Sequence, residues 1–133
     1  PGANLVGNPG FESDTSGWDT AGSPQLSLAR VSGGHSGSWS AKVTNTGTTS
    51  VSSTLNDAPN WVQTSQAGTY TGSLWVRSDH GGKLYLRIRE FDGGTKVGEK
   101  FIKVVLSASW QQVTGTYDPD NVFRTHQNIA PAA

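Results

Sequence analysis

A period-two alternation of apolar and polar residues is the feature that most constrains the fold of this chain. Clusters of Gly, Asn, Asp, Ser or Pro end each alternating segment, and such clusters favour turns. The pattern predicts a short strand at the N-terminus, a helical turn at residues 60–63 and seven further strands. Those strands are expected at residues 26–31, 40–45, 50–55, 69–78, 83–91, 99–106 and 109–117. This spacing predicts an all-β fold, a two-sheet antiparallel β-sandwich.

The composition fits one such domain. Only 33% of the 133 residues are hydrophobic, but five Trp, three Tyr and four Phe can close a thin core. We expect the domain at residues 1–117, because the alternation ends there and residues 118–133 depart from it. The formal net charge is zero, which argues against nucleic acid or an anionic membrane surface as partner. The absence of Cys excludes disulfides and thiolate metal sites.

Alternation also assigns the faces of two central strands. Along residues 70–77, Trp75 and Arg77 lie opposite the aliphatic positions, and along residues 83–91, Tyr85, Arg87 and Arg89 do so. If a hairpin through residues 80–82 pairs these two strands, Leu74 lies beside Ile88 and Trp75 beside Arg87. We then expect Leu74, Val76, Leu84, Leu86 and Ile88 to be buried. The opposite face would carry the aromatic and Arg side chains together. The alternative is that the two consecutive strands belong to different sheets, as happens in a jelly roll.

An aromatic and guanidinium stripe suits a sugar ligand. Pyranose rings present C–H faces that pack on aromatic rings, and their hydroxyls accept hydrogen bonds from Arg. A Trp between strands, such as Trp61, is a further stacking candidate. The alternatives to ligand binding are that each Trp packs in the core and that the Arg side chains are solvated or ion-paired. The candidate ligand residues are Trp61, Trp75, Arg77, Tyr85, Arg87 and Arg89.

Catalytic chemistry has little support in the sequence. A glycosidase needs two carboxylates about 5–9.5 Å apart across one cleft, whereas most acids here fall in turn-like segments. The three His residues are isolated and lack zinc-type spacing. We therefore expect no enzyme. A calcium ion is the more credible metal, since Glu12 and Gly-rich turns supply oxygen ligands; the alternative is an ordinary turn with a solvated Glu.

Several motifs, in order and spacing, resemble one family. These motifs are Asn4–Glu12 with Gly17-Trp18, Val31–Ser38, Gly68-Thr69-Tyr70, Leu74–Arg77, Leu86–Glu90 and Ser109–Val113. Over residues 4–117 the chain resembles the calcium-containing jelly-roll carbohydrate-binding modules of secreted bacterial polysaccharide-degrading enzymes. The resemblance implies a jelly roll that is secreted, binds a polysaccharide or oligosaccharide without catalysis, and targets a tethered enzyme to its substrate.

The resemblance also implies a structural calcium ion, with Gly10, Glu12 and Gly37 as the corresponding ligands. The family's fourth ligand, an Asp on the last strand, has no counterpart in residues 122–133. Loss of that strand would leave an open sheet edge, which favours self-association. The main alternative function is a protein-interaction or cell-surface adhesion sandwich, and a small hydrolase or lyase comes third. Neither nucleic acid nor a membrane is an expected partner.

Overall fold

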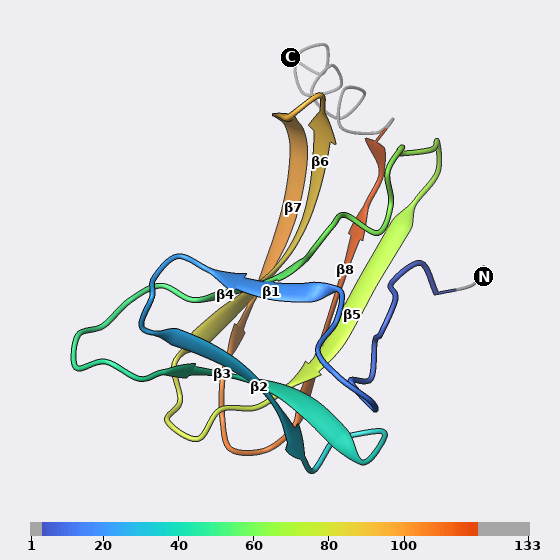
Figure 1. Cartoon of the computed structure of the whole chain (residues 1–133). Coiled ribbons are helices and arrows are strands. Elements are labelled where there is room, and N and C mark those ends of the chain that lie inside the picture. Colours follow the sequence, from blue (N-terminus) through green and yellow to red (C-terminus); the bar gives the residue numbers. More distant parts are fainter. Residues whose placement is uncertain (1–3, 120–133) are drawn as a thin grey trace, which may run out of the picture. The chain divides into compact units, whose positions relative to one another are not determined.

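The computed structural model describes residues 4–119, and these form two compact units that divide between Gln63 and Thr64. The described residues contain eight strands, paired into four antiparallel ladders (Figure 1). Their bounds are β1 Trp18–Ala21, β2 Leu26–Ser32, β3 Trp39–Asn45, β4 Thr54–Asp57, β5 Tyr70–Val76, β6 Lys83–Asp92, β7 Thr95–Val105 and β8 Gln111–Tyr117. The prediction of an all-β antiparallel fold is confirmed, and the ladders are consistent with a β-sandwich.

Three details of the strand prediction were wrong. The N-terminal residues form bends rather than a strand, because Asn8 (φ 48°) and Phe11 (φ 55°) adopt the left-handed conformation. Residues 60–63 form no helical turn, and the strand expected at residues 50–55 lies at β4, where it pairs with the unpredicted β1. Residues 4–119 include no helix long and apolar enough to span a membrane. Residues 120–133, which make up most of the predicted C-terminal segment, lie outside the described residues.

The first unit holds the β1–β4 and β2–β3 ladders and a packed Trp. The ring of Trp61 lies directly against Gly7 and Gly17, where any side chain would overlap it. Trp18 packs at a tilt on Phe11, with 5.7 Å between ring centroids, and its Nε1–H donates to the Asn8 carbonyl at 3.0 Å. Aromatic rings therefore hold the irregular N-terminal segment in place of strand pairing.

The second unit holds the β5–β8 and β6–β7 ladders. The predicted pairing of residues 70–77 with residues 83–91 was wrong, because β5 pairs with β8 and β6 pairs with β7. The β6–β7 hairpin turns through Gly93 (φ 58°) and Gly94 (φ 93°), which allow the positive φ of a two-residue turn. That tight turn favours β7 as the partner of β6. The loop at residues 79–82 instead connects two different ladders.

Within this unit the two ladders pack against each other. Gly72 and Gly115, which are partners in the β5–β8 register, face Ile88 and Ile102 of the other ladder. The most buried apolar side chains are Val113 (5% exposed) and Tyr117 (6%) on β8. The predicted inward positions Leu74, Val76, Leu84, Leu86 and Ile88 are half-buried rather than buried. A ladder of two strands covers only part of the facing layer, which leaves their edges exposed.

A hydrogen-bonded cluster lies at the end of this core. The Tyr117 hydroxyl donates to Glu90 Oε1 at 2.6 Å, and the Ser65 hydroxyl donates to Glu90 Oε2. The hydrogen bonds from Ser65 and then Tyr117 lower the pKa of Glu90. Burial, and next the hydrogen bond to Glu90, raises the pKa of Tyr117 to about 12. The cluster ties β8 to β6 and to the segment that precedes β5.

Substitution of Gly98 by Ala should destabilise the domain. A methyl group at Gly98 would overlap the Tyr117 hydroxyl, and the rigid, buried ring cannot move without losing its bond to Glu90. Such overpacking costs about 1–3 kcal/mol, measurable as a shift of the urea midpoint. Gly72→Ala is the matched control, because its methyl group would lie 3.2 Å from the flexible end of Ile88. Equal stability of the two variants would contradict this packing.

Titration should reveal the Tyr117–Glu90 bond directly. Because the folded pKa of Tyr117 is raised, its stabilising contribution is complete below about pH 10 and is lost as the pH rises through about 12. The pKa of Glu90 is lowered in the folded state, so its stability effect has the opposite pH dependence. Its contribution to folding stability is present above its ordinary pKa of 4.5 and is lost on acidification. Tyrosinate absorbance should show a group that titrates near pH 12 and is absent from Tyr117→Phe. Complete titration by pH 11 would contradict the assignment.

Candidate functional site

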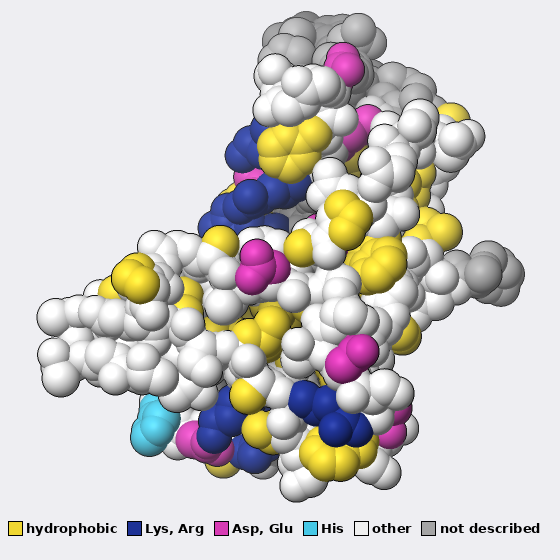
Figure 2. Space-filling view, in the orientation of Figure 1, with side chains coloured by type: hydrophobic (Ala, Val, Ile, Leu, Met, Phe, Trp, Pro, Cys, Tyr) yellow, Lys and Arg dark blue, Asp and Glu magenta, His cyan; other side chains and the backbone are white. Residues whose placement is uncertain are grey.

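The outer face of the β6–β7 ladder gathers aromatic and charged side chains. The register pairs Tyr85 with Lys103, Arg87 with Phe101 and Arg89 with Glu99, so all six point away from the half-buried Leu86 and Ile88. We call these six residues the basic–aromatic face. Figure 2 shows Lys and Arg side chains beside apolar ones over these strands. Alternation along one hairpin is enough to build this face.

An aromatic pair and a guanidinium occupy the middle of the basic–aromatic face. The rings of Tyr85 and Phe101 meet edge to face, with 5.8 Å between centroids and 75° between planes. The guanidinium of Arg87 lies 5.5 Å from each ring centroid. Both rings remain accessible, since Tyr85 is 36% and Phe101 55% exposed. An apolar surface therefore adjoins fixed hydrogen-bond donors.

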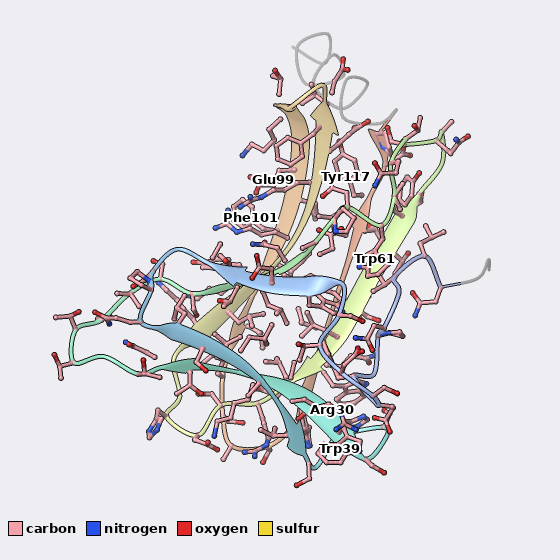
Figure 3. All side chains as sticks on the ribbon, viewed as in Figure 1. Arg30, Trp39, Trp61, Glu99, Phe101 and Tyr117 are labelled. Carbon is pink, nitrogen blue, oxygen red and sulfur yellow. The ribbon has the colours of Figure 1, made fainter. Side chains whose placement is uncertain are left out.

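A single carboxylate organises the cations of this face. Glu99 Oε2 accepts from Arg89 Nε at 3.0 Å and from Arg87 Nη1 at 3.3 Å, and Glu99 Oε1 accepts from Lys96 Nζ at 3.0 Å. The Glu99 side chain is only 16% exposed, whereas the cations are 41–47% exposed. Hydrogen bonds, first from Lys96, lower the pKa of Glu99. The carboxylate thus stays ionised and fixes the two guanidinium groups. Figure 3 labels Glu99 and Phe101, which both belong to β7.

The structure brings together only half of the predicted ligand residues. Tyr85, Arg87 and Arg89 share the basic–aromatic face, whereas Trp75 and Arg77 belong to the β5–β8 ladder or its edge. Trp75 is 41% exposed and pairs with Gln112 in the register. Arg77 forms an ion pair with Asp79 at 2.9 Å and lies 5.7 Å from the ring centroid of Trp110. The expectation of one continuous stripe depended on the wrong strand pairing.

The β7 residues of the face were missed. Glu99, Phe101 and Lys103 have the same parity along residues 99–106, opposite to Ile102 and Val104. The signal that would have found them is the Gly93-Gly94 pair, which predicts a tight hairpin between β6 and β7.

Trp61 is packed within the first unit, as in the alternative of a core-packing Trp. Its ring packs on Gly7 and Gly17, and its main-chain N–H donates to Asp57 Oδ2 at 3.1 Å. Its Nε1 is buried and has no hydrogen-bond partner among residues 4–119. These contacts give the ring a packing role in the first unit. A role in ligand contact stays a prediction.

The predicted metal residues of the first unit do lie together. A side chain at Gly37 would begin 2.6 Å from Glu12 Oε2, and one at Gly10 would begin 3.5 Å from Glu12 Cγ. The Glu12 carboxylate accepts the main-chain N–H groups of Ser38 and Trp39, each at 3.1 Å. Glu12 therefore links the N-terminal segment to the start of β3.

Arg30 completes this link from the other side. Its Nε donates to the Phe11 carbonyl at 2.8 Å and its Nη2 to the Glu12 carbonyl at 2.5 Å. The guanidinium lies 3.5 Å from the ring centroid of Trp39, and Figure 3 shows the two side chains against each other. We call Glu12, Arg30 and Trp39 the N-terminal clasp. It joins the segment to β2 and β3 by hydrogen bonds and a cation–π contact.

Calcium can be tested against the donors at the clasp. Glu12 and nearby carbonyls are hard oxygen donors of the kind that calcium prefers, but calcium takes six to eight of them. Residues 4–119 contain no group of three or more His, Cys, Asp or Glu side chains that could hold a metal ion. The oxygen donors at the clasp are thus of the type that calcium binds, and Glu12 supplies the carboxylate among them.

Comparison with known proteins adds one match. The sequence model of a family described as a carbohydrate-binding domain matches residues 3–129, nearly the whole chain. Searches of curated proteins and of solved structures gave no match.

Proposed function

The chain belongs to the carbohydrate-binding domain family, and we propose that it is a non-catalytic module that binds a polysaccharide or oligosaccharide on the basic–aromatic face. The observation that carries this proposal is the exposed Tyr85–Phe101 pair, with the Arg87 guanidinium 5.5 Å from each ring centroid. Sugar C–H groups would pack on the rings, and sugar oxygens would accept from Arg87 and Arg89. Because Glu99 already orders both guanidinium groups, little side-chain freedom is lost on binding.

The face is open, so a short sugar chain would bury limited area and bind with modest affinity. Trp75 and Arg77 on the second unit and Trp61 on the first are proposed as further contacts, to be tested separately. Trp75 has the stronger support, because its ring is exposed whereas that of Trp61 is packed.

The lack of catalysis is supported by the hydrogen bonds of the two Glu residues of the second unit, Glu90 and Glu99. Glu99 binds three cations and Glu90 accepts from Tyr117 and Ser65, so neither is placed as a proton donor to a ligand. Carbohydrate-binding modules are generally non-catalytic. We propose that the module is secreted and targets an attached enzyme to its polysaccharide. The competing proposal is an interaction or adhesion module that associates with itself, and exposed Val105 (67%) and Phe101 favour testing it.

Replacing Arg87 by Ala should weaken binding to a recognised glycan about tenfold, or about 1.4 kcal/mol, without unfolding the domain. Isothermal titration against a panel of soluble polysaccharides would measure the affinity. Lys100→Ala is the matched control, since Lys100 also lies on this ladder but pairs with Ile88 on the other face. Normal glycan binding by Arg87→Ala would contradict a site on the basic–aromatic face and would point to Trp75 or Trp61 instead. Self-association without glycan binding would support the interaction module.

Calcium is proposed as a structural ion, with Glu12 as its carboxylate ligand and Gly10 and Gly37 as carbonyl ligands. An ion that binds only the folded state raises stability by mass action. A chelator should therefore lower the melting temperature of the wild type but not that of Glu12→Ala. Asp19→Ala, an exposed acid of β1, is the control and should respond like the wild type. No response of the wild type would leave Glu12 as a hydrogen-bonding residue of the clasp alone.

A further inference from the structure

The charge of the β6–β7 outer face differs sharply from that of the chain. The whole sequence has ten basic and ten acidic residues and no net charge. Five of those ten cations lie on or reach this face, against one carboxylate among the described residues, Glu99. The five are Lys83, Arg87, Arg89, Lys96 and Lys103. A neutral protein therefore presents a local positive field where it has its exposed aromatic pair.

Glu99 does not neutralise this excess of positive charge. It is one charge shared among three cations, and its two oxygens accept one N–H each from Arg87, Arg89 and Lys96. A guanidinium has five N–H donors, so these contacts use a minority of the donors of each Arg. The exposed part of each guanidinium is therefore held in place with hydrogen-bonding capacity remaining. The paired N–H donors of a guanidinium match the two oxygens of a carboxylate or sulfate better than they match isolated sugar hydroxyls.

The neighbouring positions extend the pattern along the hairpin. Lys103 pairs with Tyr85 in the register, and Lys83 pairs with the exposed Val105. Cations thus follow one another along the ladder at intervals of about two residues, roughly 7 Å. A polymer with repeated negative groups could meet several of them, while the rings of Tyr85 and Phe101 contact its sugar faces. A neutral glucan would supply no negative charge to balance the five cations beyond that of Glu99.

We propose that the ligand is an acidic polysaccharide, whose uronate carboxylates or sulfate groups bind the cations of this face. The inference rests on the proposed function and narrows its ligand class. The chemistry shared by both sources is a sugar that bears a fixed oxyanion. Nucleic acid also bears oxyanions, but the face has one aromatic pair rather than a row of stacking rings, and we take sugar as the partner.

The test compares each charged polymer with its uncharged counterpart. Polygalacturonate would be titrated against its carboxyl-reduced derivative, and dextran sulfate against dextran, at low and high salt. We expect at least tenfold weaker binding of the uncharged member of the preferred pair, and weaker binding of the charged member at high salt. The pair that shows the difference identifies carboxylate or sulfate.

Variants locate the effect. Lys103→Gln should weaken binding of the charged polymer severalfold, whereas Lys100→Gln, of the same charge change but paired with Ile88, should leave it unchanged. Melting curves confirm that both variants are folded. Equal loss in the two variants would overturn the assignment to this face.

The remaining outcomes separate this inference from the proposed function. Equal binding of charged and uncharged polymers would overturn the acidic ligand while supporting carbohydrate binding. Binding of no glycan in the panel would overturn the proposed function itself. Equal affinity for a single-stranded oligonucleotide of matched charge, lost in Arg87→Ala, would show a general polyanion surface and overturn the inference.

Discussion

The register of the β6–β7 hairpin is the constraint on which both the core and the candidate site depend. With Arg87 opposite Phe101, the aliphatic residues of both strands face the β5–β8 ladder and the charged and aromatic residues face outward. A slip of one residue would exchange the two faces of the slipped strand. The Gly93-Gly94 turn fixes the register at one end, and packing of Ile88 and Ile102 against Gly72 and Gly115 fixes it along the core. One geometric choice thus stabilises the second unit and assembles its outer face.

Local pattern was sufficient for the strands of the second unit and for the parity of single strands. The alternation in residues 83–91 correctly placed Tyr85, Arg87 and Arg89 on one face, because side-chain direction in a strand depends only on position. Pairing between strands depends on distant partners and on turns, which periodicity does not encode. The loop at residues 79–82 looked like a hairpin turn, so Trp75 was placed beside Arg87 rather than beside Gln112. The residues contributed by β7 were lost with the same error.

The first unit was harder to predict because few of its contacts are periodic. The N-terminal segment is held by the N-terminal clasp and by aromatic packing, and these contacts join residues far apart in the sequence. Trp61 illustrates the difficulty. A Trp in a polar loop suggests a ligand platform, but only three-dimensional proximity to Gly7 and Gly17 shows that its ring is packed. The short β1 was also missed, since four residues with two polar positions give little alternation.

The central claim is that the basic–aromatic face contacts sugar, and side-chain NMR during titration with a recognised oligosaccharide tests it most directly. Ring signals of Tyr85 and Phe101 and Nε–H signals of Arg87 and Arg89 report on this face, while the Trp75 and Trp61 indoles report on the other candidate positions. The account predicts saturable shifts of the first group, with little change at Trp61. Saturable shifts confined to the Trp indoles or to residues 4–63 would contradict it.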